Sequence, residues 1–199
     1  MQRPFFMSFD RLYAAVQAHD CPISTRWLKE KAIELSSITR IQEQWSSIID
    51  HTAIRGFYIE GPLGPPVPLG LNESLIVLSR TMCKGHQGDY WRRFVYTKEL
   101  MHVFDTAEEK ASDEKSFDTQ IEKFGDPAAG MSPQYRAEIK ALWRALGVLC
   151  PEATRKHLRA SLESNSISYD VVSATLRLPV IYVRELMRPD FEGFLKASM

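Results

Sequence analysis

The chain has 199 residues, of which 44% are hydrophobic and 25% are charged, as expected for one globular domain with a buried core. Basic and acidic residues number 25 each, so the formal net charge is +0 and the chain lacks the overall basic excess of many nucleic-acid-binding domains. Cys21, Cys83 and Cys150 have no CxxC spacing and no apolar run approaches the ~20 residues that span a bilayer, so we expect a cytoplasmic protein with reduced thiols and no cysteine zinc site.

Apolar residues at helical spacing dominate the first quarter of the chain. They predict one helix over residues 8–20, ended by Pro22, and a second helix from about Thr25 to Ile54, with a candidate break at Ser36-Ser37. We therefore expect an N-terminal helical region over residues 1–55. Its apolar faces would either join the core or dock a partner.

Strand and turn signals follow this region. The segment 57–60 reads as a short strand, residues 61–66 are a proline-rich loop, and residues 67–71 and 74–78 suggest one or two further strands. These segments predict a small antiparallel sheet.

The rest of the chain predicts helices. One begins near Asp89 or Tyr90 and extends to Phe104, and the stretch 106–120 after it is a charged loop or an exposed helix. Further helices are expected over residues 132–150, with Pro133 in the first turn, over 152–162, and as a short pair at 168–176 and 179–187. The expected fold class is α+β.

The most informative segment is Lys98-Glu99-Leu100-Met101-His102. Zinc peptidases use His-Glu-x-x-His on a helix, because residues i and i+4 share one face and two imidazoles can bind one metal, while the glutamate polarises the attacking water. Here Lys98 stands at the first position, and Glu99 and His102 occupy the other two.

The surroundings of this segment resemble the ImmA/IrrE family of zinc metallopeptidase-like proteins, in which an Arg-Phe-Thr-type segment precedes His-Glu-Leu-Gly-His. The matching residues are Arg93, Phe94, Glu99, Leu100 and His102. The order of elements is also similar: helices, a small sheet, the motif helix, and a helix that supplies a third ligand. The resemblance covers residues 56 to 187 and implies a gluzincin-like helical domain over residues 56–199.

Two further segments extend the resemblance. The family's third-ligand helix carries Glu-x-x-Ala and ends about ten residues later in a Leu-Leu-Met-Pro-like tetrapeptide; here Glu138–Ala141 and Val148–Pro151 match, so Glu138 takes the third-ligand position. Residues 168–187 resemble the small helical segment that ends many relatives. By resemblance, Glu99 is the catalytic residue and His102 and Glu138 are metal ligands.

Three residues depart from the family pattern. Met101 replaces a small residue, Leu142 replaces the usual asparagine or aspartate, and Lys98 replaces a ligand histidine. The last departure bears on the chemistry, because a lysine ammonium with a reference pKa near ~10.4 has no lone pair to offer zinc and repels a dication. We therefore predict little or no peptidase activity and no tightly bound zinc.

The substitution suggests that Lys98 stands in for the metal. Its ammonium would lie near Glu138, and also near Glu99, and neutralise carboxylates that are costly to bury without a cation. The competing interpretation is that Lys98 points into solvent. A third interpretation keeps zinc on His102 and Glu138 with water or Asp105, or with His86 as a replacement ligand, although two or three weak ligands rarely make a tight site.

The resemblance implies a function in regulation. Relatives are commonly encoded by phages and mobile elements and act on helix-turn-helix repressors, so this chain is expected to bind a regulatory protein rather than cut it. The first alternative is a zinc-dependent endopeptidase that cleaves such a protein. The second is a DNA-binding regulator that uses the C-terminal helices and the basic cluster at Arg155, Lys156, His157 and Arg159, although the apolar segment 180–183 suits packing better than groove contact.

Overall fold

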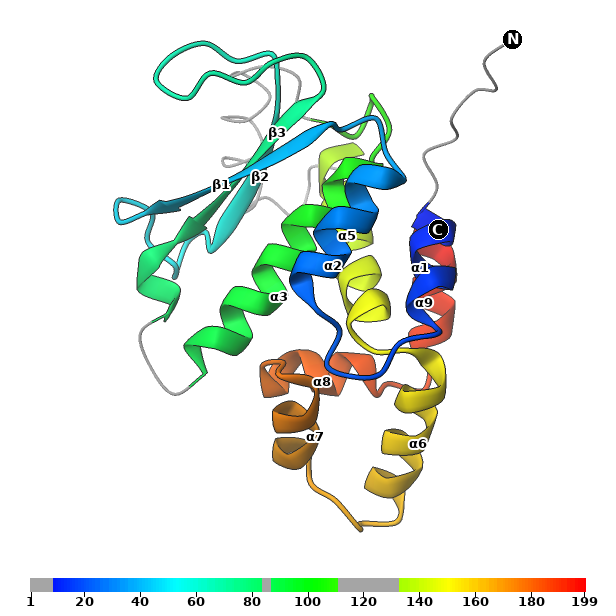
Figure 1. The fold of residues 1–199 in the computed structure, drawn as a ribbon. Helices are drawn as coiled ribbons and strands as arrows, with labels where there is room; N and C mark the ends of the chain where they lie inside the picture. The colour runs from blue at the N-terminus through cyan, green and yellow to red at the C-terminus, as the bar shows by residue number, and fades with distance from the viewer. Residues whose placement is uncertain (1–8, 84–86, 111–132) are drawn as a thin grey trace, which may run out of the picture.

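The computed structural model describes residues 9–83, 87–110 and 133–199. These residues form eight α-helices and a three-stranded sheet, which confirms the α+β class (Figure 1). The strands are β1 (Arg40–Ser46), β2 (Gly56–Glu60) and β3 (Glu73–Ser79). The α-helices are α1 (Phe9–Val16), α2 (Thr25–Glu34), α3 (Gly88–Met101), α5 (Pro133–Leu149), α6 (Glu152–Glu163), α7 (Tyr169–Leu176), α8 (Val180–Leu186) and α9 (Phe191–Ser198). Short 3-10 turns follow β3 (η1, Arg80–Cys83) and α3 (η2, His102–Phe104).

The central strand of the sheet is β3, which pairs in parallel with β1 and antiparallel with β2. Both of its faces are apolar: Ile76 and Leu78 belong to the main core, and Leu75 and Val77 belong to a smaller cluster on the other face. A strand that is covered on both sides reads as a continuous hydrophobic run, and this explains the sequence Leu75-Ile76-Val77-Leu78. Strand β2 is an edge strand among the described residues and faces α3.

Two predictions about the first half of the chain are wrong. The helix expected from Thr25 to Ile54 ends at Glu34, and β1 follows it, so the expected N-terminal helical region 1–55 contains a strand. The sheet is mixed rather than antiparallel, because β1 runs parallel to β3. The β-branched residues Ile38, Thr39 and Ile41 favour an extended chain, and the backbone hydrogen bonds to β3 override the helical spacing that continues through this segment.

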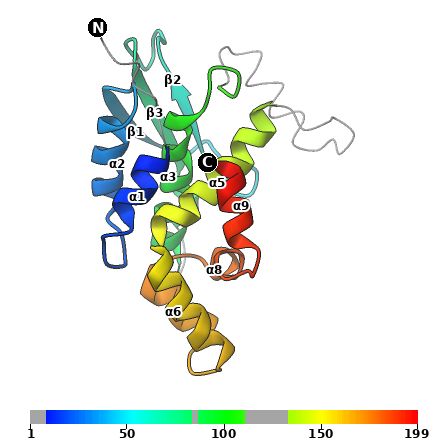
Figure 2. The ribbon, with the colours of Figure 1, turned by 90° about the vertical axis from the view of Figure 1, so that its right-hand side faces the viewer.

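The helices α3 and α5 form the centre of the helical part. Helix α3 contacts β2, β3, α2 and α5, and α5 in turn contacts α1 and α9. In the view of Figure 2, α5 runs between α1 and α9, which bring the two ends of the described chain to the same part of the molecule. Buried side chains on both central helices join one core, which on α5 includes Ala141, Ala145 and Leu146.

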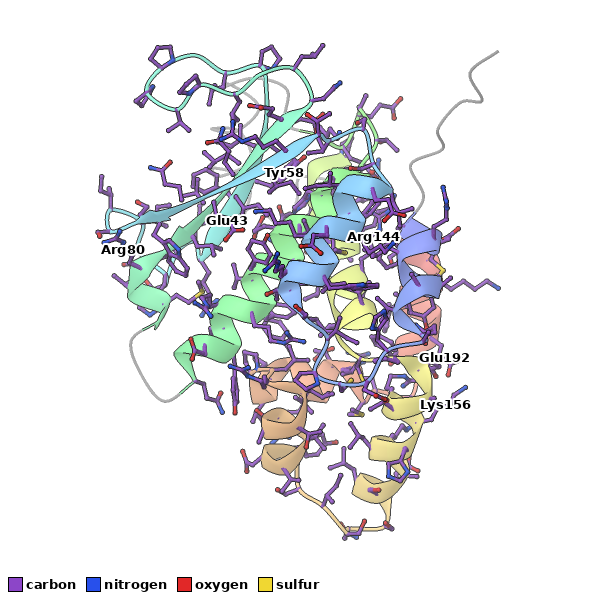
Figure 3. The ribbon with its side chains drawn as sticks, in the orientation of Figure 1. Glu43, Tyr58, Arg80, Arg144, Lys156 and Glu192 are labelled. Carbon is purple, nitrogen blue, oxygen red and sulfur yellow. The ribbon has the colours of Figure 1, made fainter. Side chains whose placement is uncertain are left out.

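Helices α6, α7 and α8 lie below this layer in Figure 1, whereas α9 returns to lie beside α1. The expected helices at 152–162, 168–176 and 179–187 are confirmed as α6, α7 and α8. Helix α9 was not anticipated: it is only eight residues long, and it buries Phe191 and Leu195. The side chains of Glu192 on α9 and Lys156 on α6 approach within 3.7 Å where the two helices meet (Figure 3). None of the described helices combines the length and apolarity needed to cross a bilayer.

Candidate functional site

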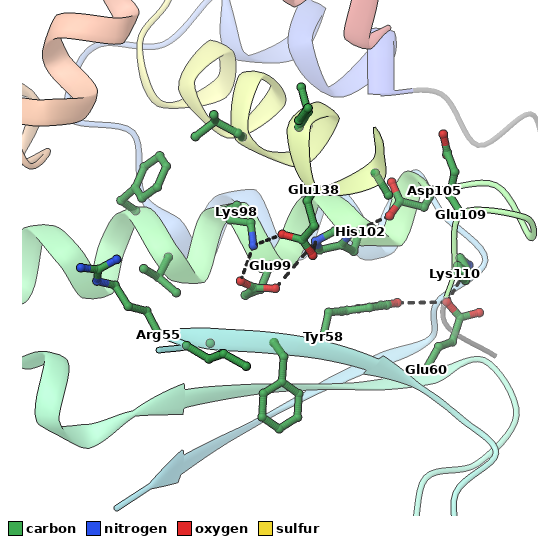
Figure 4. Close-up of a pocket in the computed structure, with 18 of the residues that line it drawn as sticks. Arg55, Tyr58, Glu60, Lys98, Glu99, His102, Asp105, Glu109, Lys110 and Glu138 are labelled. Carbon is green, nitrogen blue, oxygen red and sulfur yellow. Dashed lines mark hydrogen bonds and ion pairs between the residues drawn. The ribbon is translucent and has the colours of Figure 1, made fainter. Parts of the chain in front are cut away.

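The candidate site lies in a cleft of about 600 Å³ whose walls come from β2, α3 and the start of α5 (Figure 4). Helix α3 begins with the acidic Asp89 in its first turn and ends with Lys98 in its last turn, a charge order that suits the helix dipole. Its buried residues, such as Leu100 and Met101, fix the helix in the core. Lys98, Glu99 and His102 are thereby presented to the cleft, as the motif predicted.

The ammonium group of Lys98 forms two ion pairs. Its Nζ lies 2.9 Å from Oε1 of Glu99 and also contacts Oε2 of Glu138, which reaches across from α5. Only 20% of the Lys98 side chain is exposed, and for Glu99 the value is 2%, so water screens these pairs little. The predicted ion pairs of Lys98 are therefore confirmed, and the interpretation with Lys98 in solvent is wrong.

The electrostatics keep these groups charged. Burial lowers the pKa of Lys98, but the Glu99 and Glu138 carboxylates outweigh it, so the pKa rises above its ordinary value. Burial raises the pKa of Glu138, but Lys98 and His102 outweigh it and hold this pKa well below its usual range. The cleft therefore contains a stable cation between two acids at neutral pH.

The imidazole of His102 is held by carboxylates on both sides. Its Nδ1 lies 2.6 Å from Oδ2 of Asp105, and its Nε2 lies 3.4 Å from Oε1 of Glu138 without hydrogen-bond geometry. The Tyr58 ring stacks on the imidazole with a centroid distance of 6.0 Å. Burial lowers the pKa of His102, but Asp105 and Glu138 more than offset this and raise it to about 10, so the ring is an imidazolium at neutral pH.

A buried arginine continues this chain of charges away from the cleft. Nη1 of Arg144 lies 3.1 Å from Oδ1 of Asp105, and its Nε donates to the carbonyl of Ser198 at 2.8 Å. Arg144 was not among the residues predicted from the sequence. The available signal was an arginine inside the apolar run 141–149 of a predicted helix, since an arginine is rarely buried without a partner. Helix α9 is thus linked through Arg144 and Asp105 to His102.

The two ends of the cleft differ in character. At one end Tyr58 donates to Oε2 of Glu60 at 3.1 Å, and Lys110 pairs with the same carboxylate at 2.6 Å. At the other end the guanidinium of Arg55 stacks on Trp91 at 4.1 Å. Within the described part of the chain, Arg55 has no ion pair with a carboxylate. This end is therefore positively charged and otherwise apolar.

The arrangement of donors does not suit a catalytic zinc ion. Such sites use three protein ligands and an open position, whereas His102 Nε2 and Glu138 are the two candidate ligands here, and the Lys98 ammonium is paired with that same Glu138 carboxylate. The described residues contain no group of three or more His, Cys, Asp or Glu side chains arranged to hold a metal ion. Asp105, named as a substitute ligand, points its carboxylate at His102 Nδ1 and Arg144 instead.

Two other predicted candidates lie elsewhere. His86, considered as a replacement ligand, falls outside the described residues. In the basic cluster, Arg155 is 2% exposed and pairs with Glu152 and Glu192, while Arg159 pairs with Glu163 at 2.8 Å. Guanidinium groups that are bound in this way are poorly placed to contact phosphates.

The chain matches no family model, no curated protein and no solved structure, so the resemblance to the ImmA/IrrE family rests on its residues alone.

Proposed function

We propose that this protein is a catalytically inactive metallopeptidase-like protein of the ImmA/IrrE type that binds a segment of a regulatory protein in the cleft without cutting it. The observation that carries the proposal is the Lys98 ammonium between Glu99 and Glu138, at the helix position where the family motif has a ligand histidine. A cation in this place neutralises the two carboxylates that would otherwise bind the zinc ion and activate the attacking water.

Hydrolysis by the family mechanism needs a glutamate that is free to polarise a water molecule. The Glu99 carboxylate is instead nearly fully buried and tied to Lys98, with His102 Nε2 3.8 Å from its other oxygen. His102 is paired through Nδ1 with Asp105 at 2.6 Å, and its Nε2 faces Glu138 at 3.4 Å. Each of the three motif positions is therefore occupied by a charged group that is already paired.

The lining of the cleft supports binding of a protein segment. Apolar side chains, including Phe94 on α3 and Ile139 and Leu142 on α5, surround the charged centre. The edge strand β2 lies along the same cleft, and an edge strand can pair with an extended peptide through its backbone. At the positive end, Arg55 offers a guanidinium to an acidic side chain or a chain terminus. A short extended segment with an acidic residue fits these features.

A peptide selected from a displayed random library against the purified protein tests the proposal. Its affinity is measured by fluorescence anisotropy, and its mass is followed by mass spectrometry during incubation with the protein. We expect an intact peptide whose affinity falls on the order of tenfold or more in Arg55→Ala, as for loss of a charge-assisted pair. Arg159→Ala, which removes a guanidinium from exposed α6, is the matched control and leaves the affinity unchanged.

The rival function is a zinc-dependent endopeptidase, since Glu99, His102 and Glu138 all line one cleft. Cleavage of the bound peptide that requires zinc and disappears in Glu99→Gln would establish the rival and overturn the proposal. Binding that is equally strong in the Arg55→Ala and Arg159→Ala variants would place the peptide outside the cleft and also overturn it.

A further inference from the structure

Two cysteines that are far apart in the sequence lie close together outside the cleft. Cys21, in the connection between α1 and α2, has its Sγ 3.9 Å from the carbonyl oxygen of Leu149, the last residue of α5. The thiol of the next residue, Cys150, donates to the carbonyl oxygen of Pro151 at 3.7 Å and lies close enough to the Cys21 thiol for each to shift the pKa of the other. Both cysteines are free thiols.

The two thiols differ in access. Cys21 is half-buried and so partly open to solvent, whereas Cys150 is only 2% exposed. An oxidant would therefore meet Cys21 first, with Cys150 directly behind it.

The surroundings of Cys21 favour its thiolate. Arg93 on α3 interacts electrostatically with Cys21, and its Nε and Nη2 are buried without a hydrogen-bond partner. Burial and the nearby Arg177 both disfavour the charged form of Arg93 and lower its pKa. A thiolate at Cys21 would offset these effects and stabilise the Arg93 guanidinium. The neighbouring Cys150 thiol, together with Arg93 and Thr154, lowers the pKa of Cys21 against the effects of burial and Asp20.

The surroundings of Cys150 favour its protonated thiol rather than its thiolate. The neighbouring Cys21 thiol and burial raise the pKa of Cys150, so its thiol holds its proton more firmly than the Cys21 thiol does. A low-pKa, accessible thiol next to a second cysteine is the arrangement found in cysteines that sense peroxide.

We propose that Cys21 is a peroxide-reactive cysteine and that Cys150 resolves its oxidised form into a Cys21–Cys150 disulfide. In the first step the Cys21 thiolate attacks a hydroperoxide, the O–O bond breaks, and the products are a sulfenic acid and, after protonation, water or an alcohol. In the second step the Cys150 sulfur attacks the Cys21 sulfur, the S–O bond breaks, and the thiol proton leaves with the hydroxyl group as water. The peroxide is reduced by two electrons, and the two thiols are oxidised by two electrons.

The disulfide would join the connection between α1 and α2 to the junction between α5 and α6. Because it closes a long loop, it should raise the melting temperature by roughly 5–10 °C. This site is independent of the cleft and of the proposed binding function.

The test uses the 199-residue protein, reduced and then exposed to hydrogen peroxide, with peptide mapping by mass spectrometry. We expect one cross-linked peptide that joins Cys21 to Cys150, and it should also form in Cys83→Ser, the matched control. In Cys150→Ser, a sulfenic acid should persist on Cys21 and react with dimedone. In Cys21→Ser, oxidation of Cys150 should be slower on the order of tenfold or more, because its thiol is buried and protonated.

A variant of Arg93 tests the electrostatic part. Arg93→Gln should slow the oxidation of Cys21 at neutral pH, and Arg93→Lys, which keeps the charge, should restore part of the rate. Circular dichroism checks that each variant is folded. The proposal is overturned if both thiols stay reduced when free cysteine is fully oxidised, if the cross-link needs Cys83, or if Cys150→Ser leaves Cys21 unlabelled.

Discussion

The Lys98 ammonium on α3 and the Glu138 carboxylate on α5 form an ion pair across the floor of the cleft, and the same ammonium binds Glu99. The pair joins two helices that also pack directly against one another. It thus combines a structural role, in which a cation compensates buried acids, with a functional one, in which the position of a metal ligand is occupied by a positive charge.

Replacement of Lys98 by methionine should be strongly destabilising. The variant keeps an unbranched side chain one atom shorter than lysine but leaves Glu99 and Glu138 buried without their cation, and removal of one partner of a buried pair costs about 3–5 kcal/mol. Urea unfolding measures the loss. Lys31→Met, which breaks an exposed pair with Glu34, is the control and should cost about 1 kcal/mol or less. Equal losses in the two variants would mean that the Lys98 pair is weakly formed in solution.

The stability of the protein should fall as the pH rises from 7 toward 10. The pKa of His102 is raised to about 10, so its protonated form stabilises the fold fully below the unfolded-state pKa of ~6.5, and this contribution is lost as the pH approaches 10. Urea unfolding at several pH values should give a clear decline for the native protein and a much flatter profile for His102→Gln. Parallel profiles would show that another group controls the alkaline limb.

At acidic pH the dependence of stability on pH has the opposite sign, so the stability should fall as the pH falls. The pKa of Glu138 is held below its usual value by Lys98 and His102 against the effect of burial, so this contribution is present above the unfolded-state value of ~4.3 and is lost as the pH falls further. Glu138→Gln should therefore lower the stability at pH 7 and reduce its dependence on pH below 4.5. If the variant loses stability on acidification as steeply as the native protein does, other carboxylates cause the acid limb.

Arg144 should control the attachment of α9. Arg144→Met removes both the partner of buried Asp105 and the donor to the Ser198 carbonyl, so we expect a loss of about 3–5 kcal/mol and faster amide exchange in residues 191–198. The control is Arg159→Met, which removes an exposed pair on α6 and should cost about 0.5 kcal/mol or less. Unchanged exchange in α9 would contradict the link.

Gly147 should be sensitive to the smallest enlargement. A Cβ at this position on α5 would lie 2.8 Å from Cδ1 of Leu195, so Gly147→Ala should cost about 1–3 kcal/mol by overpacking, and Leu195→Val should relieve part of it. Gly193→Ala on α9 is the matched control, because its Cβ would meet no atom within 4 Å. That variant should be neutral or slightly stabilising, since alanine favours the helix. Thermal unfolding of the native protein, Gly147→Ala, the double variant Gly147→Ala with Leu195→Val, and Gly193→Ala checks the order of their melting temperatures.

The sequence predicted much of the site but less of the fold around it. Helical periodicity places Glu99, in the last turn of α3, and His102, the residue after α3, on one face, and the resemblance led to Glu138 as the residue opposite them. The interaction of Asp105 with Arg144 joins residues 39 positions apart, and nothing local signals it. Strand β1 was missed for a related reason: its conformation depends on pairing with β3, about thirty residues later, whereas its apolar spacing alone also fits a helix.

Zinc binding to the native protein tests the central claim most directly. Isothermal titration of the metal-free protein, with Lys98→His and Lys140→His compared side by side, separates the motif position from a lysine on the neighbouring α5 that pairs with Glu109. We expect no tight binding to the native protein or to Lys140→His, and gain of a stoichiometric site in Lys98→His, where an imidazole joins His102 and Glu138. A native protein that holds one equivalent of zinc tightly would contradict the account.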